Sequence, residues 1–113
     1  MNQLGGEAEA LAATYLKQRG LKLVTSNYQC RFGEIDLIMR EGNTLVFVEV
    51  RLRSNSRFGG PGSSITSAKR QRLVHTAQHY LQQYGEMPCR FDAILMRSAD
   101  MQQIDWIKNA FDA

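Results

Sequence analysis

The stretch EIDLIMREGNTLVFVE, residues 34–49, decides the fold, because it places two apolar runs on either side of a short polar break. Gly42-Asn43 suits a two-residue hairpin loop, so the two runs are expected to pair as antiparallel strands. Each run carries one carboxylate that does not suit a buried strand. If Glu41 pairs with Thr44, the register puts these two acids, Asp36 and Glu49, directly opposite one another.

Two opposed carboxylates need a positive charge between them. Side chains that face each other across an antiparallel pair have Cβ atoms about 4.5–5.5 Å apart, and like charges there cost up to roughly 1 kcal/mol. Carboxylate oxygens suit hard divalent cations, and Mg²⁺ typically uses one or two carboxylates together with waters and phosphate oxygens. The pair therefore predicts a Mg²⁺ or Mn²⁺ site with Asp36 and Glu49 as the protein ligands.

Arg51 adds a fixed cation to this pair, because side chains alternate along a strand and Arg51 lies on the same face as Glu49. Two acids and a guanidinium on one sheet face suit phosphodiester cleavage, in which a metal activates water and the cation neutralises the phosphate. A structural interpretation also stands. The same register puts Arg51 opposite Glu34, as half of a cross-strand ion pair. A slip of one residue would separate Asp36 from Glu49.

The chain around this hairpin alternates helical and strand patterns. Apolar residues recur at helical spacing over residues 6–19 and 65–84, and a glycine follows each segment as a stop signal. Strands are expected, in chain order, over residues 21–28, 34–40, 44–52, 89–96 and, with a weaker pattern, 102–108. A Gly- and Ser-rich basic loop spans residues 53–64. The order αβββαβ(β) predicts an α/β fold, with a mixed sheet flanked by helices.

Length and composition limit the class of protein. A chain of 113 residues predicts a single domain, residues 1–113. No apolar run approaches the roughly 20 residues of a membrane span, so no membrane partner is expected. The acidic start MNQLGGEAEA lacks the features of a signal peptide, which favours a cytoplasmic protein. Cys30 and Cys89 are then expected to be reduced thiols.

The basic residues are unevenly distributed. Residues 51–85 contain no acid, and this block suits a polyanionic partner, although a solvated basic surface would have the same composition. Nucleic-acid backbone contacts are expected from Arg53, Arg57, Lys69 and Arg72. Lys69, Arg72, His75 and His79 lie opposite the apolar face of the second helix, as a stripe suited to phosphates. The two histidines also have the spacing of a two-His zinc pair, but no third ligand is evident.

Four motifs together carry a family resemblance: GEIDLI at residues 33–38, FVEVR at 47–51, SAKRQRL at 67–73 and RFD at 90–92. With them, the chain from Gly5 to Phe111 resembles the YraN-like family of small bacterial predicted endonucleases. That family is similar to the archaeal Holliday junction resolvases and to the wider PD-(D/E)xK nuclease superfamily. The resemblance implies a restriction-endonuclease-like sheet and a divalent-metal site.

The resemblance also implies roles for single residues. Asp36 matches the metal-binding Asp, and Glu49 matches the Glu of the ExK element. Glu9 matches the acid on the first helix, at the edge of the apolar face, with Ala8 in place of the usual Gly. Arg51 stands where the element has Lys. Arg cannot lose its proton and so cannot act as a base, but it can hold a phosphate bidentately.

The resemblance therefore implies a metal-dependent endonuclease that acts on DNA, with branched or damaged DNA as candidate substrates. Cutting both strands in the manner of a resolvase would require a homodimer. The alternative is a nucleic-acid-binding or protein-interaction module that kept the nuclease fold and lost cleavage, and a third interpretation makes the acids merely ion-paired. Asp92 either bonds within the sheet or supports the site, and the sequence leaves both open.

Overall fold

The computed structural model describes residues 3–52, 66–96 and 104–111, so Arg53 and Arg57 lie outside the described residues. Two helices and five strands follow one another along the chain. They are α1 (Gln3–Gln18), β1 (Lys22–Cys30), β2 (Gly33–Glu41), β3 (Thr44–Leu52), α2 (Ser67–Tyr84), β4 (Cys89–Met96) and β5 (Ile104–Phe111). This order confirms the predicted mixed α/β fold, including the strand that the sequence predicted with the weaker pattern.

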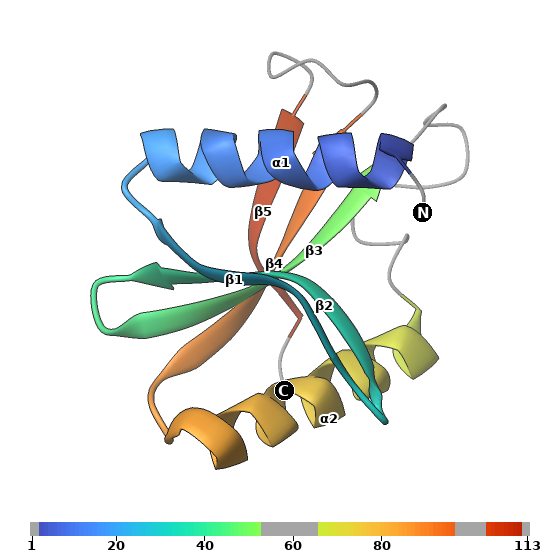
Figure 1. The fold of residues 1–113 in the computed structure, drawn as a ribbon, viewed down its shortest axis with the longest axis vertical. Helices are drawn as coiled ribbons and strands as arrows, with labels where there is room; N and C mark the ends of the chain where they lie inside the picture. Colours follow the sequence, from blue (N-terminus) through green and yellow to red (C-terminus); the bar gives the residue numbers. More distant parts are fainter. Residues whose placement is uncertain (1–2, 53–65, 97–103, 112–113) are drawn as a thin grey trace.

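The five strands form one mixed sheet in the order β1-β2-β3-β4-β5. Three neighbouring pairs are antiparallel, whereas β3 and β4 run parallel. A parallel pair needs a crossover connection, and α2 lies within it. Figure 1 shows the result: α1 covers one face of the sheet and α2 covers the other. Neither helix in the described part of the chain has the length and apolarity to cross a membrane.

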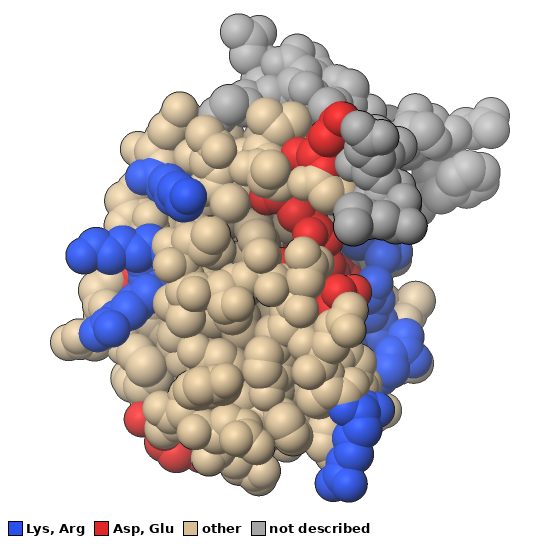
Figure 2. All heavy atoms as spheres, viewed as in Figure 1, with Lys and Arg blue, Asp and Glu red and all other residues tan. Residues whose placement is uncertain are grey.

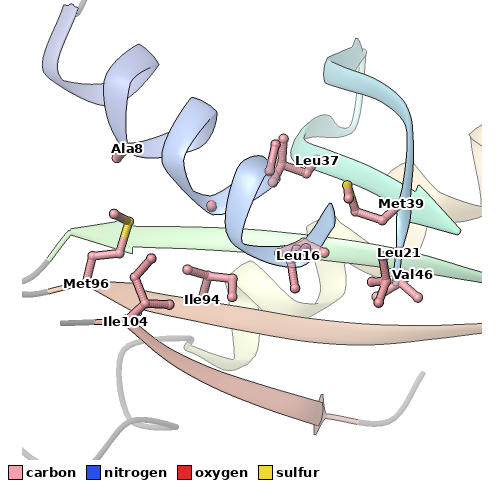
Figure 3. Packing of buried hydrophobic residues seen from close by; sticks show 12 residues of the cluster. Ala8, Leu16, Leu21, Leu37, Met39, Val46, Ile94, Met96 and Ile104 are labelled. Carbon is pink, nitrogen blue, oxygen red and sulfur yellow. The ribbon is translucent and has the colours of Figure 1, made fainter. Parts of the chain in front are cut away.

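The central strand β3 is buried on both faces because its two rows of side chains enter different cores. Val46 and Val48 pack with Leu16 of α1 in one cluster, part of which Figure 3 shows. Phe47 packs with Leu73 of α2 in the other cluster. The alternation along β3 carries on to Glu49, so this acid lies on the α2 side of the sheet.

The element boundaries differ from the predicted ones by a few residues. The largest differences are three residues, at the start of α1, which begins at Gln3 and not at residue 6, and at the end of β5, which lies at Phe111 and not at residue 108. Helix α2 begins at Ser67 because Thr66 is its N-cap: the Thr66 Oγ1 accepts a hydrogen bond from the backbone N–H of Lys69 at 3.2 Å. This cap fixes the first turn of α2, where Lys69 lies.

Candidate functional site

The β2–β3 hairpin has the predicted register, from Glu41 with Thr44 to Leu37 with Val48. The regular ladder then stops, and Asp36 does not form the next pair with Glu49 that the sequence predicted. Its Oδ2 instead accepts a hydrogen bond from the backbone N–H of Val50 at 2.8 Å. The Asp36 side chain thus accepts a hydrogen bond from the backbone of β3 at the point where the regular β2–β3 ladder ends.

The neighbouring strand gives a local reason for this break. The β1–β2 register runs from Ser26 with Leu37 to Tyr28 with Ile35, and the position between them in β1 is Asn27. Asn27 has φ 54°, which is left-handed backbone that asparagine tolerates better than most residues. The β1–β2 pairs on either side keep one register, but Asn27 and Asp36 are not among them, so the pairing is irregular on both sides of Asp36.

The carboxyl groups of Asp36 and Glu49 meet at this break. Burial raises the pKa of Asp36 to about 9, and the hydrogen bond to Glu49 and the negative charge of Glu49 contribute to the rise. The Val50 N–H lowers the Asp36 pKa, but by less. At neutral pH the metal-free pair therefore carries a proton between its two carboxyl groups.

Lys69 of α2 supplies a positive charge at the same place. Its Nζ lies 2.6 Å from Oε2 of Glu49, and the exposed fractions of the two side chains are 30% and 5%. Oε2 is buried, and this contact is an ion pair that lacks hydrogen-bond geometry, so no residue in the described ranges donates a hydrogen bond to Oε2. The structure brings Lys69 to the acids, a contact that the sequence did not predict, since Lys69 was expected only on the nucleic-acid backbone.

A sequence signal for this contact existed. Lys69 is the third residue of α2, and the first turn of this helix has no acidic residue. A cation in the first turn is opposed by the helix dipole. An acidic partner elsewhere in the fold offsets this cost, and Glu49 is that partner.

Glu9 approaches the pair from the other side of the sheet. It is half-buried on α1, and its negative charge also contributes to the raised pKa of Asp36. Glu9 lines a hollow of about 360 Å³ between α1 and the first two strands, together with Lys17, Asn27 and Leu37. The charge of Glu9 therefore acts on Asp36 from the α1 side of the sheet, while Glu49 and Lys69 lie toward α2.

Arg51 is half-buried on β3, two residues beyond Glu49, and pairs in register with Leu95 of β4. The β2–β3 ladder ends before the level of Glu34. Glu34 is exposed, and its Oε2 accepts a hydrogen bond from Gln29 Nε2 at 3.0 Å. Arg51 and Glu34 are therefore not a register pair of the ladder, and an ion pair between them stays a prediction.

Charged groups gather on one face of the molecule. Figure 2 shows acidic atoms in a band between the levels of α1 and α2, with basic side chains beside the lower end of the band. Arg72 is exposed on α2, as expected of a residue that contacts phosphates. Its role on nucleic acid stays a prediction, like those of Lys69, Arg53 and Arg57.

The histidines of α2 lie in an aromatic cluster. His79 Nδ1 lies 2.6 Å from the hydroxyl oxygen of Tyr28, which occupies one of its ring nitrogens. The ring of Phe32 lies 5.7 Å from that of His75 and 6.3 Å from that of His79. These contacts hold the β1–β2 turn against α2.

Asp92 serves the sheet. It is fully buried and accepts hydrogen bonds from Trp106 Nε1 at 2.9 Å and from the backbone N–H of Asn109 at 3.0 Å. Arg90 also donates to it, and reaches Glu41 with its other end. Asp92 pairs in register with Val48, so it points to the α1 face, away from Glu49. It therefore bonds within the sheet.

Asp36 and Glu49 fit a hard divalent cation. Across residues 3–52, 66–96 and 104–111, no three Cys, His, Asp or Glu side chains form a metal-binding group. Two carboxylates are nevertheless what Mg²⁺ typically takes from a protein, and waters and phosphate oxygens complete its shell. The buried Glu49 Oε2 has no hydrogen-bond donor among the described groups, and the facing carboxyls are forced to hold a proton. A divalent cation would relieve both costs.

Comparison with known proteins gives the relationships of the chain. Residues 8–96 match the family described as "Uncharacterised protein family UPF0102". A UPF0102 protein of Methylobacillus flagellatus is 58% identical over 113 residues and the whole of both chains. UPF0102 protein NE0719 of Nitrosomonas europaea is 58% identical over 109 residues, which are 96% of this chain and 92% of that protein. With matches of this length and identity, the chain belongs to the UPF0102 family.

Proposed function

We propose that this protein is a metal-dependent endonuclease that hydrolyses phosphodiester bonds in DNA, with Mg²⁺ or Mn²⁺ held by Asp36 and Glu49. The observation that carries the proposal is the meeting of these two carboxyl groups at the end of the β2–β3 ladder, where the pKa of Asp36 is raised to about 9. If the two acids had only a structural role, the fold would bear the cost of burying two facing carboxyl groups without any gain in function. The resemblance to the nuclease superfamily supports the same chemistry.

Each residue of the site has a role that follows from its position. Asp36 and Glu49 hold the cation, and the Val50 N–H fixes the orientation of the Asp36 carboxylate. The bound cation supplies a Lewis acid that activates water and stabilises charge on the phosphate. Arg51 contributes a fixed charge near the reacting phosphate, and Glu9 supports the site through its field at Asp36.

The substrate follows from the charges around the acids. The exposed Arg72 and the predicted contacts of Arg53 and Arg57 would hold the DNA backbone while the acid pair faces one phosphate. We further propose branched or damaged DNA as substrate, a homodimer where both strands are cut, and action in the cytoplasm. The substrate and the homodimer rest on the resemblance to the resolvases.

One observation favours a second candidate function. The ion pair between Lys69 and Glu49 already neutralises part of the acid pair, and Arg51 replaces the usual lysine. A nucleic-acid-binding or protein-interaction module that has lost cleavage would have both features. Metal binding separates the two functions, because a module without chemistry has no need of the cation.

The deciding experiment measures cleavage of single-stranded, duplex, flapped and four-way DNA with Mn²⁺ and with a chelator. We expect Mn²⁺-dependent cleavage of at least one of these DNA structures by the wild type, and none by Asp36→Asn or Glu49→Gln. Glu86→Gln is the matched control, because it removes an exposed carboxylate from the turn after α2 and should leave the rate unchanged. Failure of the wild type to cleave any of the four, together with no Mn²⁺ binding by calorimetry, would favour the module.

A further inference from the structure

Lys69 occupies one of the two carboxyl oxygens of Glu49, a proposed metal ligand. Its ammonium nitrogen is 2.6 Å from Glu49 Oε2, and this oxygen is buried with no hydrogen-bond donor among the described residues. Mg²⁺ requires its ligand oxygens at about 2.0–2.1 Å. An ammonium and a divalent cation on the same oxygen would repel each other strongly at such distances. A cation bound through Oε2 of Glu49 would therefore displace the ammonium of Lys69 from this oxygen.

The lysine is able to leave. Its side chain is 30% exposed, whereas that of Glu49 is only 5% exposed, so the ammonium reaches the acid from the solvent side. The stem has four flexible carbons, and the Thr66 cap fixes the backbone of Lys69 but not its ammonium. Movement of the ammonium toward water does not require either core to open. The helix dipole, which disfavours a cation in the first turn, lowers the cost of that movement.

We propose that Lys69 is an internal counter-ion of the metal site, and that it competes with the divalent cation for Glu49 and contacts a DNA phosphate once displaced. This inference rests on the proposed function. In the metal-free protein the ammonium neutralises Glu49 and keeps the acid pair compact. A cation held by Glu49 would leave the ammonium of Lys69 on the solvent side of the acid pair, where a DNA phosphate could pair with it.

This role complements Arg51. The guanidinium of Arg51 is on β3 and carries a fixed charge two residues from Glu49. Lys69 brings a compact ammonium to the same acid from α2, so the chain retains a lysine at the site although the residue after Val50 is arginine.

The experiment is a calorimetric titration of Mn²⁺ into the wild type, Lys69→Met and Lys69→Arg, without DNA. Removing the competing charge in Lys69→Met should tighten Mn²⁺ binding about tenfold, which corresponds to about 1.4 kcal/mol. Lys69→Arg keeps the charge and should bind Mn²⁺ like the wild type. Arg72→Met is the matched control: it removes an exposed cation one turn further along α2 and should leave Mn²⁺ affinity unchanged.

A second measurement tests the contact with DNA. Affinity for a four-way DNA is measured in Ca²⁺ and in a chelator for the same variants. Lys69→Met should lose affinity relative to the wild type in Ca²⁺ and not in the chelator, because the ammonium is free for phosphate only when a cation holds Glu49. Arg72→Met should lose affinity under both conditions.

The outcomes separate this inference from the proposed function. Equal or weaker Mn²⁺ binding by Lys69→Met than by the wild type, with both folded by their melting curves, would overturn the counter-ion role alone. If Lys69→Met does not fold without metal, its melting temperature is measured in Mn²⁺ instead. A variant that stays unfolded in Mn²⁺ contradicts the proposal. Absence of Mn²⁺ binding in every protein, including the wild type, would overturn both proposals.

Discussion

Asp36 has the most unusual surroundings of the described carboxyl groups. Its side chain takes over a backbone position at the end of a ladder, beside a second buried carboxyl group and within the field of a third. The folded protein therefore holds a proton on Asp36 that the unfolded chain has already released at neutral pH. This difference makes the stability of the metal-free protein depend on pH.

The sign of this dependence follows from linkage. The pKa of Asp36 is about 9 in the folded protein and about 4 in an unfolded chain, so the folded state binds more protons between these values. Stability should fall as pH rises through this window. Asp36→Asn cannot ionise and retains an acceptor for the Val50 N–H, so its advantage over the wild type should grow from pH 4 to pH 9, with similar stability at the acid end.

Thermal melts in a chelator across this range check the prediction. Glu86→Gln, which removes an exposed carboxylate, should follow the wild type at each pH. Melting curves of wild type and Asp36→Asn that stay parallel across the range would show that Asp36 is ionised in the folded protein and would contradict the prediction.

Substitutions that keep or remove the positive charge of Arg51 test whether this residue has a catalytic role. If it stabilises the transition state, Arg51→Lys should preserve or raise Mn²⁺-dependent cleavage, whereas Arg51→Ala should lower it by roughly 10²–10³-fold, as for loss of one charge-stabilising donor. If its charge serves only the fold, the rates should stay nearly equal, because a cross-strand charge pair is worth only about 0.2–1 kcal/mol. Cleavage rate and melting temperature of the three proteins decide, and equal rates exclude a catalytic role.

At the level of elements, β5 depends on a buried polar network. The β4–β5 register shifts between Phe91 and Ala93, and Asn109 has φ 52°. Asp92 compensates for this irregularity by accepting from the Asn109 N–H, from Trp106 and from Arg90. The acid thus fastens the edge strand where regular ladder hydrogen bonds are interrupted.

Asp92→Ala should destabilise the protein by about 3–5 kcal/mol, because it leaves two N–H groups without their acceptor and leaves the half-buried Arg90 guanidinium with Glu41 as its remaining carboxylate partner. Denaturant unfolding followed by the fluorescence of Trp106, the only tryptophan of the chain, measures the loss. Glu34→Ala is the control: it removes an exposed hydrogen bond with Gln29 and should change stability by no more than about 0.5 kcal/mol. A loss below 1 kcal/mol for Asp92→Ala would contradict the role of the network.

At the level of the whole molecule, the candidate site lies where the layers meet. Both helix layers reach Asp36: Glu9 comes from α1, and the Lys69–Glu49 pair lies toward α2. The break between β2 and β3 is what allows a single carboxyl group to respond to both sides of the sheet. Figure 1 shows the two helices on opposite faces, so neither helix could form this site with the sheet alone.

The sequence by itself determined the parts of this arrangement that depend on neighbours along the chain. The Gly42-Asn43 loop fixes the hairpin register through a two-residue connection, and the register brings Asp36 near Glu49. Period-two alternation then assigns Phe47 and Glu49 to one face of β3, and helical periodicity identifies α1 and α2. These features are local because each depends on residues a few positions apart.

Only the tertiary structure decided which distant groups join the pair. Lys69 reaches Glu49 because the crossover from β3 to β4 lays α2 on the face where Glu49 points, and no periodicity in either segment encodes that contact. The end of the ladder at Asp36 coincides with the left-handed backbone of Asn27 in the next strand. The raised pKa of Asp36 follows from burial by all these elements together, since desolvation depends on the packed fold and not on any single segment.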